Sequence, residues 1–161
     1  VSLVPETFGP VFVFVSERFS VLDAQTVMPK LYGRVVAKKQ TSRIDEISLP
    51  EDLQLDLVDR ISIPLDFLNA EAVVVALESS VRGTGWYNEA ITYGIPIIIT
   101  SAGQQLVFET TYPNYPYIKG NTLKSKDDLK AHVSEIKGFD NKKYVKNYMN
   151  GMKTRLSNIL K

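Results

Sequence analysis

The chain contains no cysteine and a single histidine, His132, among its 161 residues. Without cysteine there is neither a disulfide framework nor a thiolate nucleophile, and one histidine cannot supply a multi-histidine metal site. No stretch approaches the roughly 18 consecutive apolar residues of a membrane helix, and the first fifteen residues lack the basic start of a signal peptide. We therefore expect a cytoplasmic protein without zinc chemistry, a transmembrane segment or a bound cofactor.

The overall composition, with 44% apolar and 23% charged residues, is typical of a soluble globular protein. Its length predicts a single domain over residues 1–161. The start at Val1 rather than Met suggests that a leader, a tag or a larger N-terminal part is missing, and in the last case the chain is the C-terminal part of a longer protein. Net charge is +1, but residues 124–161 hold ten Lys and Arg against four Asp and Glu. Lysines spread along a helix favour a solvated face over a polyanion site, so no nucleic-acid partner is predicted.

Short apolar runs alternate with helical patterns along the chain. Buried strands are predicted in five segments: GPVFVFVS, GRVVAKK, DRISI, EAVVVAL and IPIIIT. Helices are predicted at residues 22–28, 50–57, from Ser62, at 86–93, 103–108, from Ser125 and at 142–160. Such alternation predicts an α/β domain, a Rossmann-like three-layer sandwich with a mainly parallel sheet.

Parallel sheets of this kind bind ligands at the carboxyl ends of their strands. Four loops therefore become candidates for a binding site: Ser16–Arg18, Lys38–Lys39, Glu78–Gly85 and Thr100–Gln105.

The loop Glu78–Gly85 has the composition of an anion site. Gly83 and Gly85 free backbone amides to approach a ligand at a helix N-terminus, and Arg82 can clamp a phosphate in bidentate fashion. Hydroxyls are available from Ser79, Ser80 and Thr84. A glycine-eased turn with a solvated arginine explains the same residues equally well. The loop is neither a dinucleotide fingerprint, which needs a third glycine, nor a Walker loop, which needs a Gly-Lys pair.

Other candidates surround this turn. Glu89 lies one turn into the following helix, where its carboxylate can accept hydrogen bonds from ribose hydroxyls or merely complement the helix dipole. Trp86 and Tyr87 can stack on a base or sugar, although core packing explains at least one of them. Arg18 and Lys38 follow strands and can add positive charge, yet each alone is more often a surface cation.

The segment RGTGWYNEAITYGIPIII, with Ser79–Ser80 before it, resembles the C-terminal, nucleotide-sugar-binding half of GT-B glycosyltransferases. The resemblance covers mainly residues 61–136. It implies that Gly83–Gly85 and the helix N-terminus bind the donor diphosphate, that Glu89 binds the ribose, and that Gln104, in SAGQQ, lies near the donor sugar. It also implies a nucleotide-sugar partner and an N-terminal acceptor domain outside this chain, without which the domain binds but does not catalyse.

Two other functions remain open from the sequence. The segments LNAEAVVVAL and RGTG also resemble nucleoside deoxyribosyltransferases, which are single domains of this length, but Tyr87 replaces the nucleophilic glutamate in that register. Glu89 would then have to act from two residues further along. A third possibility is an interaction domain without a ligand, with the aromatic loop Tyr112–Tyr117 as its contact surface.

Overall fold

The computed structural model describes residues 10–16, 25–38, 49–77 and 82–160. These residues form a six-stranded sheet in the order β3-β2-β1-β4-β5-β6, and every neighbouring pair is parallel. The strands are β1 Val11–Val15, β2 Gly33–Lys38, β3 Leu53–Val58, β4 Ala70–Val75, β5 Ile97–Ile99 and β6 Ile118–Lys119. The predicted Rossmann-like α/β class with a parallel sheet is confirmed.

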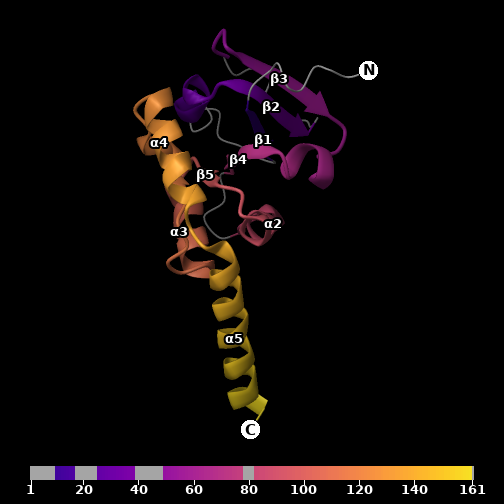
Figure 1. The fold of residues 1–161 in the computed structure, drawn as a ribbon, viewed down its shortest axis with the longest axis vertical. Coiled ribbons are helices and arrows are strands. Elements are labelled where there is room, and N and C mark those ends of the chain that lie inside the picture. Colours follow the sequence, from indigo (N-terminus) through magenta and orange to yellow (C-terminus); the bar gives the residue numbers. More distant parts are fainter. Residues whose placement is uncertain (1–9, 17–24, 39–48, 78–81, 161) are drawn as a thin grey trace.

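Both faces of the sheet are buried, which gives the domain three layers. In β1 the side chains alternate, so that Phe12 and Phe14 join one core cluster while Val13 joins the other. Helix α4 (Lys126–Lys137) supplies Leu129 to the first cluster. Helices α2 (Gly85–Tyr93) and α3 (Ala102–Thr111) contribute side chains to the second cluster, among them Tyr87 and Phe108. Figure 1 shows α4 and α2 on opposite sides of the sheet.

The prediction of a helix at Pro50–Leu57 is wrong, because this segment contains strand β3. Its leucines, Leu53, Leu55 and Leu57, alternate with polar residues in the period of two that a strand requires. The strand pairs along the whole of β2, with Leu55 opposite Val35. Ser48 as a helix cap, with Pro50 in the first turn, favoured the helical interpretation, but the side-chain periodicity and the free edge of β2 decide the structure.

The predicted strand DRISI is also wrong. Residues 59–62 form a turn and a short extended connection, and a single π-helical turn, η4 (Ile63–Phe67), follows. The start signal at Ser62 is confirmed, because its hydroxyl accepts a hydrogen bond from the Leu65 N–H while the Asp66 carboxylate accepts one from the Ser62 N–H. This reciprocal cap ends the extended connection at Ser62.

Both helices predicted around the candidate site are present, and α2 has the predicted bounds to within one residue, whereas α3 continues three residues beyond the predicted end at Phe108. The Thr84 side chain caps α2 by accepting from the Trp86 N–H, and Gly94 ends it in the left-handed region at φ 71°. Ser101 caps α3 in the same way. The two-residue strand β6 was not predicted, because a segment that short carries no periodicity.

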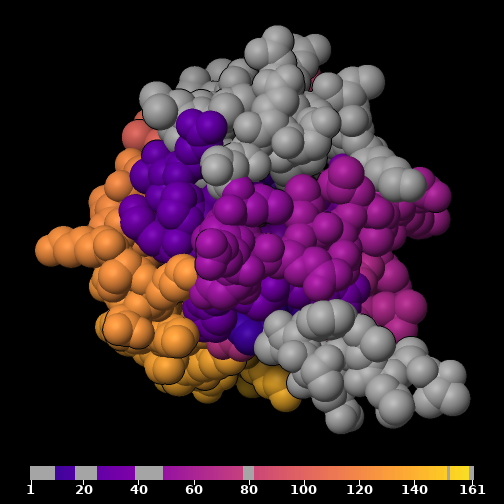
Figure 2. Space-filling model, turned by 90° about the horizontal axis from the view of Figure 1, so that it is seen from above, coloured from indigo at the N-terminus to yellow at the C-terminus, as the bar shows by residue number. Residues whose placement is uncertain are grey.

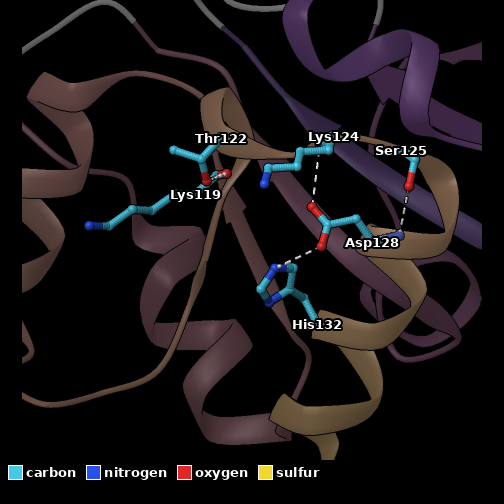
Figure 3. Close-up of polar contacts among 6 residues, drawn as sticks. All are labelled: Lys119, Thr122, Lys124, Ser125, Asp128 and His132. Atoms are coloured by element: carbon cyan, nitrogen blue, oxygen red, sulfur yellow. Dashed lines mark hydrogen bonds and ion pairs between the residues drawn. The ribbon is translucent and has the colours of Figure 1, made fainter.

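Helix α4 begins where the sequence predicts. The Ser125 hydroxyl accepts from the Asp128 N–H, and the Asp128 carboxylate accepts from the Lys124 N–H and lies 3.3 Å from His132 Nε2 (Figure 3). Lys126 pairs with Asp52, just before β3, so the first turn of α4 lies near the amino end of that strand. In the space-filling view the orange surface, which includes α4, borders the purple and magenta surface of residues 25–77 (Figure 2).

The first turns of the C-terminal helix α5 (Asn141–Leu160) anchor it to the body, and Gly151 and Arg155 further along line a groove together with Thr110 and Pro113. Tyr144 and Tyr148 donate hydrogen bonds to the carbonyl oxygens of Pro113 and Thr111. The remaining turns run away from the rest of the domain (Figure 1). No helix within the described ranges combines the length and the apolarity needed to cross a membrane.

Candidate functional site: a cleft at the switch point of the sheet

The strand order reverses direction at β1. From β1 the chain continues to β2 and β3 on one side, whereas β4, β5 and β6 lie on the other. At such a switch point the connections leave in opposite directions and open a crevice outside the carboxyl ends of the strands. A cleft of about 770 Å³ opens there. Its lining residues are Phe14, Val15, Ser16, Lys38, Arg60, Ile61, Ser62, Ile63, Pro64, Thr84, Gly85, Trp86 and Glu89.

The N-terminus of α2 forms one wall of this cleft. Gly85 is the first helical residue, and a Cβ placed on it would meet no heavy atom within 4 Å beyond its own helix. Its φ is not positive, so neither backbone conformation nor packing demands glycine at this position. What glycine does provide is access, because a ligand can approach the amides of the first turn without meeting a side chain.

Charged side chains line the cleft on both sides. Lys38, at the carboxyl end of β2, and Arg60, just after β3, provide two cations, while Glu89 on α2 provides a carboxylate. Such an arrangement can neutralise an anionic group near the helix N-terminus and accept hydrogen bonds from neutral hydroxyls elsewhere on the same ligand.

Trp86 combines a structural and a surface role. Its ring packs against Phe67 with centroids 5.0 Å apart, yet the residue is only half-buried and also lines the cleft. Tyr87, by contrast, is buried. The expectation that at least one of the two aromatic residues belongs to the core is met by Tyr87.

Four of the predicted binding residues line the cleft together: Lys38, Thr84, Gly85 and Glu89. Among the described candidates, Arg82, Gly83 and Gln104 are not part of the lining. Arg82 is exposed on the loop before α2. Ser79, Ser80 and Arg18 lie outside the residues that the structure describes.

Gly83 has a structural reason for being glycine. A Cβ there would lie 3.0 Å from a carbon of the Tyr87 ring and 3.4 Å from a methyl of Val107. The glycine therefore allows the loop to pass closely over a buried aromatic ring. The two glycines of the Gly-Thr-Gly turn thus differ, because a Cβ at Gly83 would contact the Tyr87 ring tightly and one at Gly85 would meet no neighbour.

Gln104, the residue expected near a donor sugar, is fully buried and its side chain hydrogen-bonds to neighbouring protein groups. Its Oε1 accepts a hydrogen bond of 2.7 Å from the Tyr87 hydroxyl, and its Nε2 donates to the Arg82 carbonyl oxygen. Burial, with a smaller contribution from the charge of Tyr117, raises the pKa of the Tyr87 phenol well above its usual value. The amide therefore ties α3 to α2 and to the loop before it.

Arg60 was missed as a site residue because the sequence placed it in a strand. The signal that could have found it is Ser62, since a helix capped there leaves Arg60 and Ile61 in a connection that follows a strand, where ligands bind. Within the described ranges no group of three His, Asp or Glu side chains is arranged to hold a metal ion.

No protein-family model matches the chain, and a search of curated proteins finds no match. Solved structures with a similar fold include the glycotransferase of kitacinnamycin (15% identity, 80% of this chain and 35% of that one, TM-score 0.48) and the glycosyltransferase SnogD from Streptomyces nogalater (10%, 89% and 44%, 0.45). A third is CalG4, the calicheamicin glycosyltransferase (13%, 87% and 37%, 0.48). The chain thus spans less than half the length of each. All three are glycosyltransferases, the class that the sequence resembles, but at these TM-scores the function has to be argued from the cleft itself.

Proposed function

We propose that the domain binds a nucleotide-sugar donor in the cleft at the switch point and serves as the donor-binding part of a glycosyltransferase. The observation that carries the proposal is the shared lining of one cleft by Gly85, Glu89 and Lys38, which come from two different walls. The diphosphate lies against the open first turn of α2, where the amides and the helix dipole favour negative charge. The ribose hydroxyls donate to the Glu89 carboxylate.

The two cations of the cleft complete the electrostatics. Sugar transfer leaves negative charge on the departing nucleoside diphosphate, and fixed cations and amide dipoles lower the barrier by stabilising that charge. Lys38 and Arg60 line the cleft, where their positive charges can stabilise the departing nucleoside diphosphate. In this proposal the acceptor-binding residues and the groups that activate the acceptor belong to a further part of the enzyme.

The deoxyribosyltransferase hypothesis has no support in the structure. Tyr87, which occupies the nucleophile's register, is buried and donates its hydroxyl hydrogen to Gln104 rather than facing the cleft. For the interaction-domain hypothesis, Tyr115 of the aromatic loop is buried and its ring packs against Phe139 and Tyr144, whereas Pro113 and Asn114 of the same loop are exposed.

A thermal-shift titration with nucleoside diphosphates tests the proposal. A ligand at a hundred times its Kd stabilises by about 2.7 kcal/mol, which for a domain of this size raises Tm by roughly 5–10 °C. Lys38→Ala and Arg60→Ala should each weaken the response, whereas Lys124→Ala, on the loop before α4, should not. The parent nucleosides, which lack phosphate, should bind far more weakly. The proposal fails if no nucleoside diphosphate raises Tm.

A further inference from the structure

The outer half of α5, taken here as residues 149–160, carries an apolar stripe that is exposed to solvent. Met149, Leu156 and Ile159 are 49%, 57% and 78% exposed. At 100° per residue these three positions fall within an arc of about 80° on the helix. Figure 1 shows that this half of the helix extends away from the sheet and the other helices.

Cations border the stripe on both sides. On the same helical projection Lys153 lies about 40° beyond one edge of the arc, with Lys146 close to it. Arg155 lies about 40° beyond the other edge, where it also lines a groove together with Thr110 and Pro113. The opposite face carries neutral polar residues: Asn147, Asn150, Thr154, Ser157 and Asn158. Over the whole of α5 there are five Lys and Arg and no Asp or Glu.

We propose that the outer half of α5 is a docking surface for an anionic lipid bilayer, lying in the plane of the interface. Apolar side chains of the stripe enter the acyl boundary while the bordering cations reach the lipid phosphates, which is how basic amphipathic helices bind membranes. The long stems of Lys153 and Arg155 suit this position, because they can lie along apolar surface while their charges remain in the headgroup layer.

Charge argues against a second copy of the chain as the occupant. In a pair of α5 helices packed through their stripes, the bordering positions of one helix face those of the other. Lys146, Lys153 and Arg155 would then meet cations and no carboxylate. An anionic surface satisfies the same cations without this repulsion.

The test is co-sedimentation of the whole chain with vesicles of pure phosphatidylcholine and of phosphatidylcholine mixed with phosphatidylglycerol. We expect binding only to the anionic vesicles, weakening as salt is raised. The double substitution Leu156→Gln/Ile159→Gln should reduce partitioning more than tenfold. Its matched control is Leu106→Gln, which removes a leucine 64% exposed on α3. Lys153→Gln/Arg155→Gln should reduce partitioning onto anionic vesicles about fivefold for each cation removed. Its control, Lys119→Gln/Lys124→Gln, removes two cations outside α5 and should have little effect on partitioning.

Three results would overturn the proposal. They are absence of binding to anionic vesicles, loss of binding equal in Leu106→Gln and in the stripe variant, and self-association in sedimentation experiments that the stripe variant abolishes. Binding to an acidic polypeptide without binding to vesicles would assign the surface to a protein partner instead. All the substituted side chains are at the surface, so each variant should keep the circular dichroism and Tm of the parent.

Discussion

Replacing Gly83 or Gly85 by alanine adds one methyl group at the start of α2. The two substitutions should have different effects on ligand binding and on folding stability. At Gly85 the added Cβ meets no heavy atom within 4 Å beyond its own helix, and the backbone is already helical. Gly85→Ala should therefore stabilise the fold by about 0.4–1 kcal/mol, because the unfolded chain loses conformational freedom and the folded chain gains no clash. For a domain of this size the gain is a rise in Tm of roughly 1–4 °C.

The same methyl group should weaken binding of the nucleoside diphosphate. Gly85 lines the cleft, so its Cβ occupies space through which a phosphate would reach the first amides of α2. Losing one hydrogen bond to a charged group costs about 1.5–3 kcal/mol, or roughly a tenfold to hundredfold increase in Kd. Gly85→Ala is thus expected to be more stable than the parent and worse at binding a nucleoside diphosphate.

Gly83→Ala is the matched control and should behave in the opposite way. Its Cβ would lie 3.0 Å from the buried Tyr87 ring, so the loop or the ring has to move. Overpacking of this kind costs about 1–3 kcal/mol of folding stability. Urea denaturation and calorimetric titration of both variants measure the two effects separately. The reasoning is refuted if Gly85→Ala binds as tightly as the parent, or if Gly83→Ala is as stable as the parent.

Two further outcomes follow from buried polar groups. Tyr87→Phe should destabilise the domain by about 1–3 kcal/mol in urea denaturation, because Gln104 Oε1 loses its 2.7 Å donor inside the core; a midpoint equal to that of the parent would show that the bond contributes nothing. Burial, with a smaller contribution from Tyr144, raises the pKa of Tyr115 to about 12 from 10.0, so the unfolded chain releases this proton first and stability should fall as the pH rises from about 10 to about 12. Tm measured across this range should decline less steeply in Tyr115→Phe, and an identical slope would contradict the assignment.

Much of the fold could be predicted because its strongest patterns are local. The apolar runs of β1, β4 and β5 are buried on both faces, and the helix starts at Ser62 and Ser125 depend on contacts within one helical turn. The alternation in β3 was outweighed by a helix-start signal, although the edge of β2 was available to pair with it. Which element covers that edge is a tertiary question that local signals do not answer.

The order of the strands along the chain predicts which loops meet at the candidate site. It does not predict which side chains of those loops point into the cleft. Because parallel strands end at one edge, Lys38 and Gly85 were expected to meet, and the cleft brings them together. Gln104 also lies near that edge, but its side chain is held by hydrogen bonds to Tyr87 on α2 and to the backbone of the loop before α2. The polar loop SAGQQ looked like ligand-binding sequence, whereas its first glutamine satisfies a buried phenol and a backbone carbonyl.

Glu89 gives the most specific test of how a ligand would lie in the cleft. If its carboxylate accepts hydrogen bonds from the ribose, the parent domain should bind a ribonucleoside diphosphate more tightly than its 2′-deoxy analogue, by about tenfold per hydrogen bond to a charged acceptor. In Glu89→Gln that preference should shrink, and in Glu89→Ala it should vanish, because the partner of the hydroxyl is gone. Comparing the ratio of the two Kd values cancels any general weakening caused by the substitution. A ratio that stays the same in all three proteins would place the ribose elsewhere, and would leave Glu89 as a first-turn carboxylate that complements the dipole of α2.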